Sequence, residues 1–206
     1  MSSFEYLSDM QTDVLKELAN IGAGNATTAL AKMVGKRIEI GVPDIQLVKL
    51  ADLQDFIGEA EKVMTGILIE LSGELNGVMM FLIDERISDQ MINILLHRDK
   101  GTEVTYNEME KSVIMEVGNI IISAYIKSIS KMTRLSISPS VPMFQIDMAS
   151  ALLSVPATQF CIVSDKVLMI QTQFSLEKTS DMVKGYYIFA PDVESFDKIF
   201  HSLGIK

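Results

Sequence analysis

The chain has 206 residues, of which 48% are hydrophobic and 22% charged, and its net charge is −9. This composition can form a substantial core, and the negative charge argues against nucleic acid as a partner. One cysteine and two histidines make a transition-metal site improbable, and no nucleotide-binding glycine motif occurs. The first residues lack the basic and apolar regions typical of a signal peptide, and no run of 18 apolar residues occurs. We therefore expect one compact domain in the cytoplasm, without membrane insertion.

The first predicted element is a long helix. Ser8 and Gln11 have the spacing of an N-cap and its capping-box partner, so the helix should begin directly after Ser8. About two turns later, Asp13, Glu17 and Asn20 share one face of this helix because their spacing of four and three residues follows the helical period. Apolar residues occupy the opposite side, which should face the core.

A hairpin and a second helix follow Pro43. Residues 63–71 and 78–84 are apolar, strand-like runs separated by a turn sequence, Ser-Gly-Glu-Leu-Asn-Gly. Residues 85–97 then have the period of an amphipathic helix. We expect Pro43 to shape a turn that leads into a strand.

The second half of the chain repeats this order. Asn107 and Glu110 predict another capped helix, and the same pattern of polar residues, proline, two strands and one helix follows it. The corresponding positions are Ser112, Glu116, Asn119 and Pro142, then strands over 167–174 and 185–190 and a helix over 193–203.

The repetition indicates an internal duplication. Aligned at an offset of 99 residues without a gap, the windows 13–46 and 112–145 share ten identities in 34 positions, where ordinary residue usage would give roughly two. Glutamate, asparagine and proline of the polar pattern are among the identities. We therefore predict one pseudo-symmetric domain composed of two repeats, about 1–104 and 105–206.

The repeated polar residues indicate a site. A single Glu-x-x-Asn is usually a solvated helix face, and an asparagine inside an exposed helix costs roughly half a kcal/mol relative to alanine. Both copies nevertheless keep the pattern, although neighbouring positions have diverged, as at Gly24 and Ser123. Duplication alone does not explain why these positions in particular are retained.

The chemistry open to glutamate and asparagine without a metal or a nucleophile is positioning. An amide can donate one hydrogen bond and accept another, so Asn20 and Asn119 could orient a water for in-line attack on a phosphoryl group. Glu17 and Glu116 could pair with a lysine beside that group. Asp13 or Ser112 could orient these side chains or contact the partner.

At these residues the chain resembles the CheC family of chemotaxis phosphatases, which is related to CheX and to the phosphatase region of FliY. The family signature is [Asp/Ser]-x3-Glu-x2-Asn-x22-Pro, and both copies match it in full. The segment beginning Asn20-Ile-Gly-Ala-Gly is also similar to the family's first long helix, and the resemblance covers essentially the whole chain. Two intact motifs and an end at Lys206 favour the CheC type over CheX and over FliY with its additional rotor domain.

The resemblance implies hydrolysis of the aspartyl-phosphate on the response regulator CheY. Glu17 and Glu116 match the lysine-contacting acids, and Asn20 and Asn119 match the water-orienting amides. The implied fold is of the α/β class, in its α+β type, with two long helices side by side on a mixed, largely antiparallel sheet. The phosphatase itself binds no cofactor, because the regulator brings Mg²⁺.

The resemblance also implies a second partner, the receptor deamidase CheD. Residues 144–152 look like the short helix that members of this type use for CheD, with Asp147 in the place of the partner-contacting acid. Two alternatives stay open. The same body occurs as a non-enzymatic module resembling the middle domain of FliM, which lacks the polar pattern, and CheD sequestration could be the main function.

Overall fold

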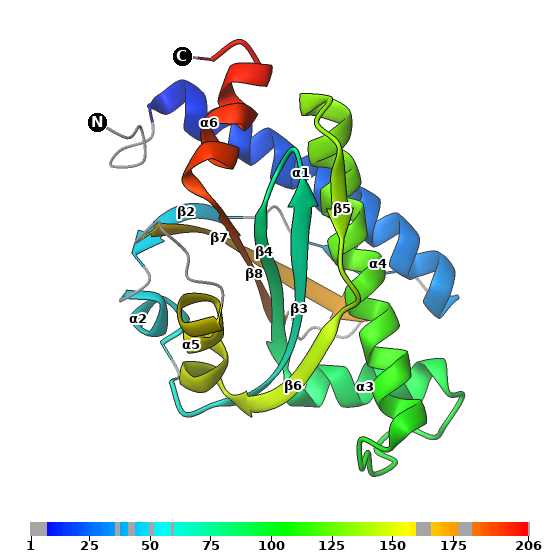
Figure 1. Cartoon of the computed structure of the whole chain (residues 1–206). Coiled ribbons are helices and arrows are strands. Elements are labelled where there is room, and N and C mark those ends of the chain that lie inside the picture. The colour runs from blue at the N-terminus through cyan, green and yellow to red at the C-terminus, as the bar shows by residue number, and fades with distance from the viewer. Residues whose placement is uncertain are drawn as a thin grey trace.

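The computed structural model describes residues 8–35, 38–40, 44–49, 52–58, 60–159, 166–176 and 183–205. One order of elements occurs twice: a long helix, two short strands, a helix, a two-stranded hairpin and a closing helix (Figure 1). The first series is α1 (Asp9–Val34), β1 (Ile38–Ile40), β2 (Asp44–Lys49), α2 (Leu53–Ile57), β3 (Val63–Gly73), β4 (Gly77–Asp84) and α3 (Glu85–Leu95). The second series is α4 (Glu108–Thr133), β5 (Ile137–Pro139), β6 (Met143–Met148), α5 (Ala149–Gln159), β7 (Lys166–Leu176), β8 (Val183–Pro191) and α6 (Val193–Ser202).

Both long helices begin at the predicted caps. Ser8 and Asn107 have extended backbone angles, and each forms a complete capping box, with Gln11 and Glu110 respectively. Glu110 is buried, and it also forms an ion pair with Arg98 and accepts a hydrogen bond from the backbone of Thr105. The hydrogen bond from Arg98 lowers the pKa of Glu110 in spite of its desolvation. The start of α4 is therefore held to the loop before it.

The eight strands form one sheet, and every pairing between described strands is antiparallel. The order is β1-β7-β8-β4-β3-β5, with β2 also on β7 and β6 also on β3. The short strands of each series thus pair with the hairpin of the other series, and β4 and β8 join the two hairpins at the centre. This exchange is the pseudo-two-fold relation, and it confirms the predicted fold class.

The pairing register repeats as well. Asp44 pairs with Gln171 where β2 meets β7, and Met143 pairs with Leu68 where β6 meets β3. Met143 lies 99 residues after Asp44, but Leu68 lies 103 residues before Gln171. The second half is thus four residues longer between the short strands and the hairpin, so a gap-free comparison of the two halves loses register there.

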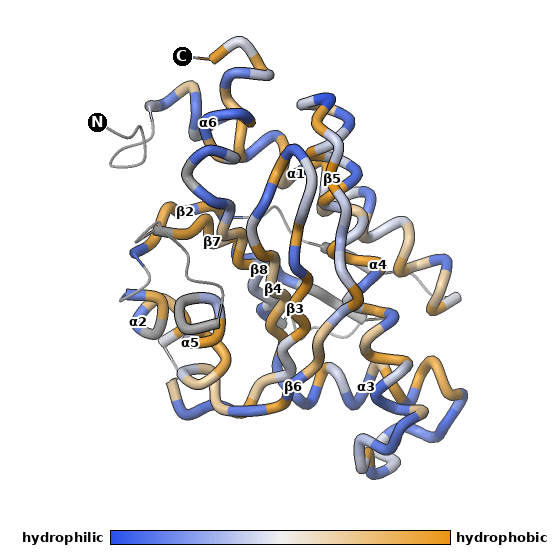
Figure 2. The backbone as a smooth tube through the Cα atoms, in the orientation of Figure 1, coloured by the Kyte–Doolittle hydropathy of each residue, from blue (hydrophilic) through white to orange (hydrophobic). Residues whose placement is uncertain are grey.

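The sheet separates two hydrophobic cores. The larger core lies against α1, α3, α4 and α6, and the smaller one lies under α2 and α5. In Figure 2 the central strands β3, β4 and β8 are largely hydrophobic, as expected for strands buried on both faces. The long helices lie side by side over the larger core, so their outer faces are free to carry the repeated polar residues.

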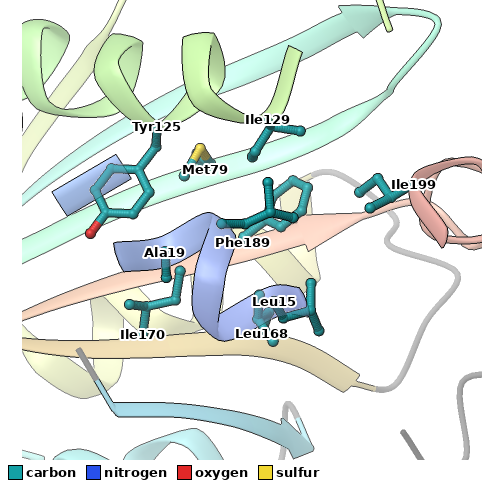
Figure 3. Close-up of a pocket in the computed structure, with 10 residues that line it drawn as sticks. Leu15, Ala19, Met79, Tyr125, Ile129, Leu168, Ile170, Phe189 and Ile199 are labelled. Atoms are coloured by element: carbon teal, nitrogen blue, oxygen red, sulfur yellow. The ribbon is translucent and has the colours of Figure 1, made fainter. Parts of the chain in front are cut away.

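Packing on the larger core includes one small cavity. It measures about 20 Å³ and is lined by apolar side chains from α1, α4, α6 and the sheet, among them Leu15, Tyr125 and Ile199 (Figure 3). Tyr125 also contacts Tyr187 of the sheet, with ring centroids 4.6 Å apart. A space of this size is too small for a substrate.

Helix α4 is the one described helix that is long and apolar enough to span a membrane by length and composition. A core helix passes the same test, and α4 buries Ile114, Val117, Ile121 and Ile122 in the larger core. Its apolar character is therefore accounted for by packing against the sheet and α1.

Candidate functional site

The first polar pattern lies on the outer face of α1. Asp13, Glu17 and Asn20 are all exposed, and they fall within about 60° of arc around the helix axis. The buried residues Leu15, Leu18, Ala19 and Gly22 point instead into the protein. The three polar side chains can consequently be reached together by a partner.

The second pattern lies on the outer face of α4. Ser112 and Glu116 are exposed, whereas Asn119 is half-buried. The hydroxyl of Ser123, one turn further along, donates a weak hydrogen bond of 3.4 Å to the side-chain oxygen of Asn119. Among the described residues the amide nitrogen of Asn119 has no acceptor, so it is available to donate to a bound group.

A groove of about 550 Å³ runs between the two long helices and contains the central part of the second pattern. Glu116 and Asn119 line it, together with residues of both helices. The remaining lining residues are Asn25, Ala29, Ile120, Ser123, Ala124 and Lys127. The groove is open to solvent and has both polar and apolar side chains in its walls, unlike the cavity beneath the helices, which is almost wholly apolar.

A hydrogen bond between the helices fixes the far wall of this groove. The side-chain amide of Asn25 donates to the hydroxyl of Ser128 over 3.0 Å, and that hydroxyl donates to the carbonyl of Ala124 over 2.8 Å. The hydroxyl of Ser128 thus accepts one hydrogen bond and donates another within the protein. Asn25 keeps its amide oxygen as an acceptor beside the groove.

The remaining predicted residues lie elsewhere. Asp13, Glu17, Asn20 and Ser112 do not line the groove. Pro142 is half-buried and directly precedes β6, whereas Pro43 lies outside the described residues.

The expected helix over residues 144–152 is wrong at its start. Residues up to Met148 belong to β6, which pairs with β3, and α5 begins only at Ala149. Phe144 and Ile146 are half-buried while Gln145 and Asp147 are exposed, an alternation that suits a strand with one face on the core. Asp147 is thus an exposed residue of the edge strand and does not lie on a helix.

Three residues of the groove did not emerge from the sequence: Asn25, Ser123 and Lys127. Ser123 and Lys127 continue the stripe of Glu116 and Asn119 at helical spacing, so extending the stripe would have found them. Asn25 lies on the other helix, and only the packing of the two helices brings it to this site.

The arrangement suits binding and orientation of a reacting group. It offers one carboxylate, two side-chain amides, one hydroxyl group and one ammonium group. Within the part of the chain that the structure describes, no group of three metal-ligating acids, histidines or cysteines occurs. A carboxylate can hold a partner's cation, and an amide can hold a water.

The comparisons with known proteins cover the segments that carry the polar patterns. The sequence model of the CheC-like family matches residues 10–47 and 109–146, the two segments that contain the polar patterns. The chain is 30% identical over 206 residues to the CheY-P phosphatase CheC of Bacillus subtilis strain 168, which covers 99% of both chains.

Two solved structures show the same fold. FliY of Thermotoga maritima superimposes with a TM-score of 0.77 at 20% identity, covering 96% of this chain and 98% of that one. The middle domain of FliM from H. pylori gives 0.68 at 12% identity, covering 95% and 99%. At these identities the likeness concerns fold alone, but the full-length sequence match goes further, and the chain belongs to the CheC-like family.

Proposed function

We propose that this protein is a hydrolase that removes the phosphoryl group from the aspartyl-phosphate of the response regulator CheY. The observation that carries the proposal is the presence of Glu116 and Asn119 together in an open groove, with the same pair exposed on α1 as Glu17 and Asn20. The name of the Bacillus subtilis relative, a CheY-P phosphatase, supports the choice of substrate.

In the proposed reaction the partner docks with its phosphorylated aspartate against one polar pattern. The glutamate accepts hydrogen bonds from a lysine of the partner and so sets the orientation of the two proteins. The asparagine amide holds a water in line with the phosphorus, and attack of that water breaks the bond between phosphorus and the aspartyl oxygen. The products are inorganic phosphate and the free aspartate carboxylate, and Mg²⁺ comes with the partner.

The fold match with the FliM middle domain supports one alternative, in which the protein is a non-enzymatic binding module of the flagellar switch. The two patterns distinguish the proposals, since a pure binding module has no need of an asparagine placed one turn from a glutamate in two copies. The decisive measurement is the decay of phosphorylated CheY with and without the protein. Faster decay supports the hydrolase, whereas stable binding without faster decay would establish the alternative.

We further propose CheD as a second partner that binds at the edge strand β6. Asp147 is exposed there, and so are Met143, Met148 and the residue that pairs with Met148, Val63. Exposed apolar side chains around one charge are typical of a protein interface. Repeating the decay assay with CheD would show whether its binding changes phosphatase activity or is itself the main role.

We also propose that residues 1–206 act as one domain of two repeats, about 1–104 and 105–206, in the cytoplasm. The exchanged strands support this, because β1 and β2 pair with β7 and would lose their partner if the halves were separated. The partner proteins named above would meet it in the same compartment.

A further inference from the structure

One cation lies in the groove of the second site. Glu116, Asn119, Ser123 and Lys127 follow each other at intervals of three and four residues and line the groove along α4. Lys127 is exposed, and it forms no ion pair with any other residue that the structure describes. Its ammonium group is therefore available to a docked protein.

The position of Lys127 excludes direct action on the phosphoryl group. Eight residues separate it from Asn119, which corresponds to about 12 Å along the helix axis. This is more than the length of a lysine side chain, so its ammonium cannot reach the water held by Asn119. Lys127 can contact only the surface of the partner around the phosphorylation site.

The partner's surface there is expected to be acidic. A phosphorylated aspartate that works with Mg²⁺ needs further carboxylates to hold the ion. This protein has a net charge of −9, so its overall field repels such a partner. A lysine inside the groove offsets that repulsion at the place where the proteins meet.

The first site has no cation at the position that corresponds to Lys127. Thr28 is the residue 99 positions before Lys127, and Gly24 takes the place of Ser123. Thr28 is exposed, but its hydroxyl donates to the carbonyl of Gly24 over 3.0 Å and carries no charge. The two sites therefore share the glutamate and the asparagine, but only the second site has a positive charge about two turns after the asparagine.

We propose that Lys127 is a docking residue of the second site, which pairs with a carboxylate on the phosphorylated receiver domain and so raises the affinity of this site for it. The inference rests on the proposed phosphatase function. It predicts that Lys127 affects the Michaelis constant KM and leaves the turnover number kcat unchanged, because the residue contacts the partner and not the reacting atoms.

The experiment uses the full chain and phosphorylated CheY, with Asn20→Ala as the background so that only the second site turns over. Lys127→Glu should raise KM about ten-fold through loss of one ion pair and gain of one repulsion, and Lys127→Arg should stay within about two-fold of the background. Adding salt should shrink the difference. In the reciprocal background, Asn119→Ala, the change Thr28→Lys should lower the KM of the first site.

The outcomes separate the two proposals. If the wild-type chain does not accelerate decay, the phosphatase function fails and this inference fails with it. If the Asn20→Ala background is active but Lys127→Glu leaves KM unchanged, Lys127 is not a docking residue while the phosphatase function stands. A fall in kcat alone would likewise overturn the docking role.

Discussion

Gly22 of α1 lies directly against the ring of Tyr125 of α4, and a Cβ atom built at Gly22 would stand 2.4 Å from Cδ1 of that ring. Contact this close exists only because glycine has no side chain. Tyr125 is itself buried against Tyr187 of the sheet and cannot move away easily. This pair therefore sets how near the two helices come, and with it the width of the groove above them.

Gly22→Ala should destabilise the protein by about 1–3 kcal/mol, since overpacking against Tyr125 outweighs the gain in helix propensity. Gly24→Ala is the matched control, because it lies in the same helix with no atom within 4 Å of its added Cβ. The control should be stabilised by up to about 1 kcal/mol. Urea unfolding of both variants measures the difference, and equal midpoints would show that the helices can separate at no cost.

Asn20→Ala and Asn119→Ala should each reduce hydrolysis of phosphorylated CheY, and the double variant should be nearly inactive, because each amide positions water at its own site. Stability should change little, because Asn20 is exposed and the half-buried Asn119 accepts only a weak hydrogen bond from Ser123. Lys32→Ala with Lys131→Ala is a suitable control, as these exposed lysines are also repeated but lie outside the polar pattern. A folded, fully active double asparagine variant would contradict the water-positioning role.

Glu17→Gln combined with Glu116→Gln should weaken docking of phosphorylated CheY, because the charged pair with the partner's lysine is lost while the shape is kept. Hydrolysis rates measured over a range of phosphorylated CheY concentrations should give a higher KM for the variant. A general base would behave differently, with lower turnover at saturating substrate and unchanged affinity. That result would show that the glutamates act in the chemical step and not in docking.

Much of the fold is predictable from the sequence because its signals are long. The capped helices α1 and α4, both hairpins and the closing helices α3 and α6 follow from N-cap spacing and from hydrophobic periods over many residues. The short elements are not predictable in this way. Strands β1 and β5 have three residues each, and their pairing with the other half of the chain is a long-range property.

The residues of the site were likewise predictable only in part. Glu116 and Asn119 can be found because they are repeated and share a helix face, but their neighbour Asn25 comes from α1. Its place depends on how α1 and α4 pack, and that depends on the missing side chain at Gly22. The sequence also did not show that Asp147 lies in a strand. The alternation of exposed and half-buried residues in β6 covers only six residues before α5 begins, which is too short for a clear pattern.

The stability of the protein should fall at low pH partly through Asp84, the N-cap of α3. Burial alone would raise the pKa of Asp84, but hydrogen bonds from Arg86 and Lys62 outweigh it and lower the value from 3.8 to about 2. A group with a lowered folded pKa contributes stability above pH 3.8, and this contribution is lost as the pH falls from about 4 to about 2. Screening by solvent around the exposed Arg86 reduces the effect to about 1 kcal/mol.

Asp84→Asn tests this contribution. The variant keeps a side-chain oxygen for the cap but loses the titrating charge, so its free energy of unfolding should be lower than wild type at pH 6 and should approach wild type at pH 2 to 3. Urea unfolding at several pH values measures both. A constant difference at every pH would show that Asp84 acts through packing or capping and not through its charge.

Asp147→Lys should abolish CheD binding and leave hydrolysis of phosphorylated CheY near the wild-type rate, because β6 is separate from the polar patterns on the long helices. Reversing the charge replaces a favourable contact by an unpaired or repelling one, which typically costs several kcal/mol in a desolvated interface. Asp99→Lys provides the control, since it makes the same charge change at an exposed position before α4. A pull-down or titration with CheD would decide. Undiminished CheD affinity would remove Asp147 from the interface, and loss of both activities together with helicity would show that Asp147 supports the fold through its bond to the backbone of Met148.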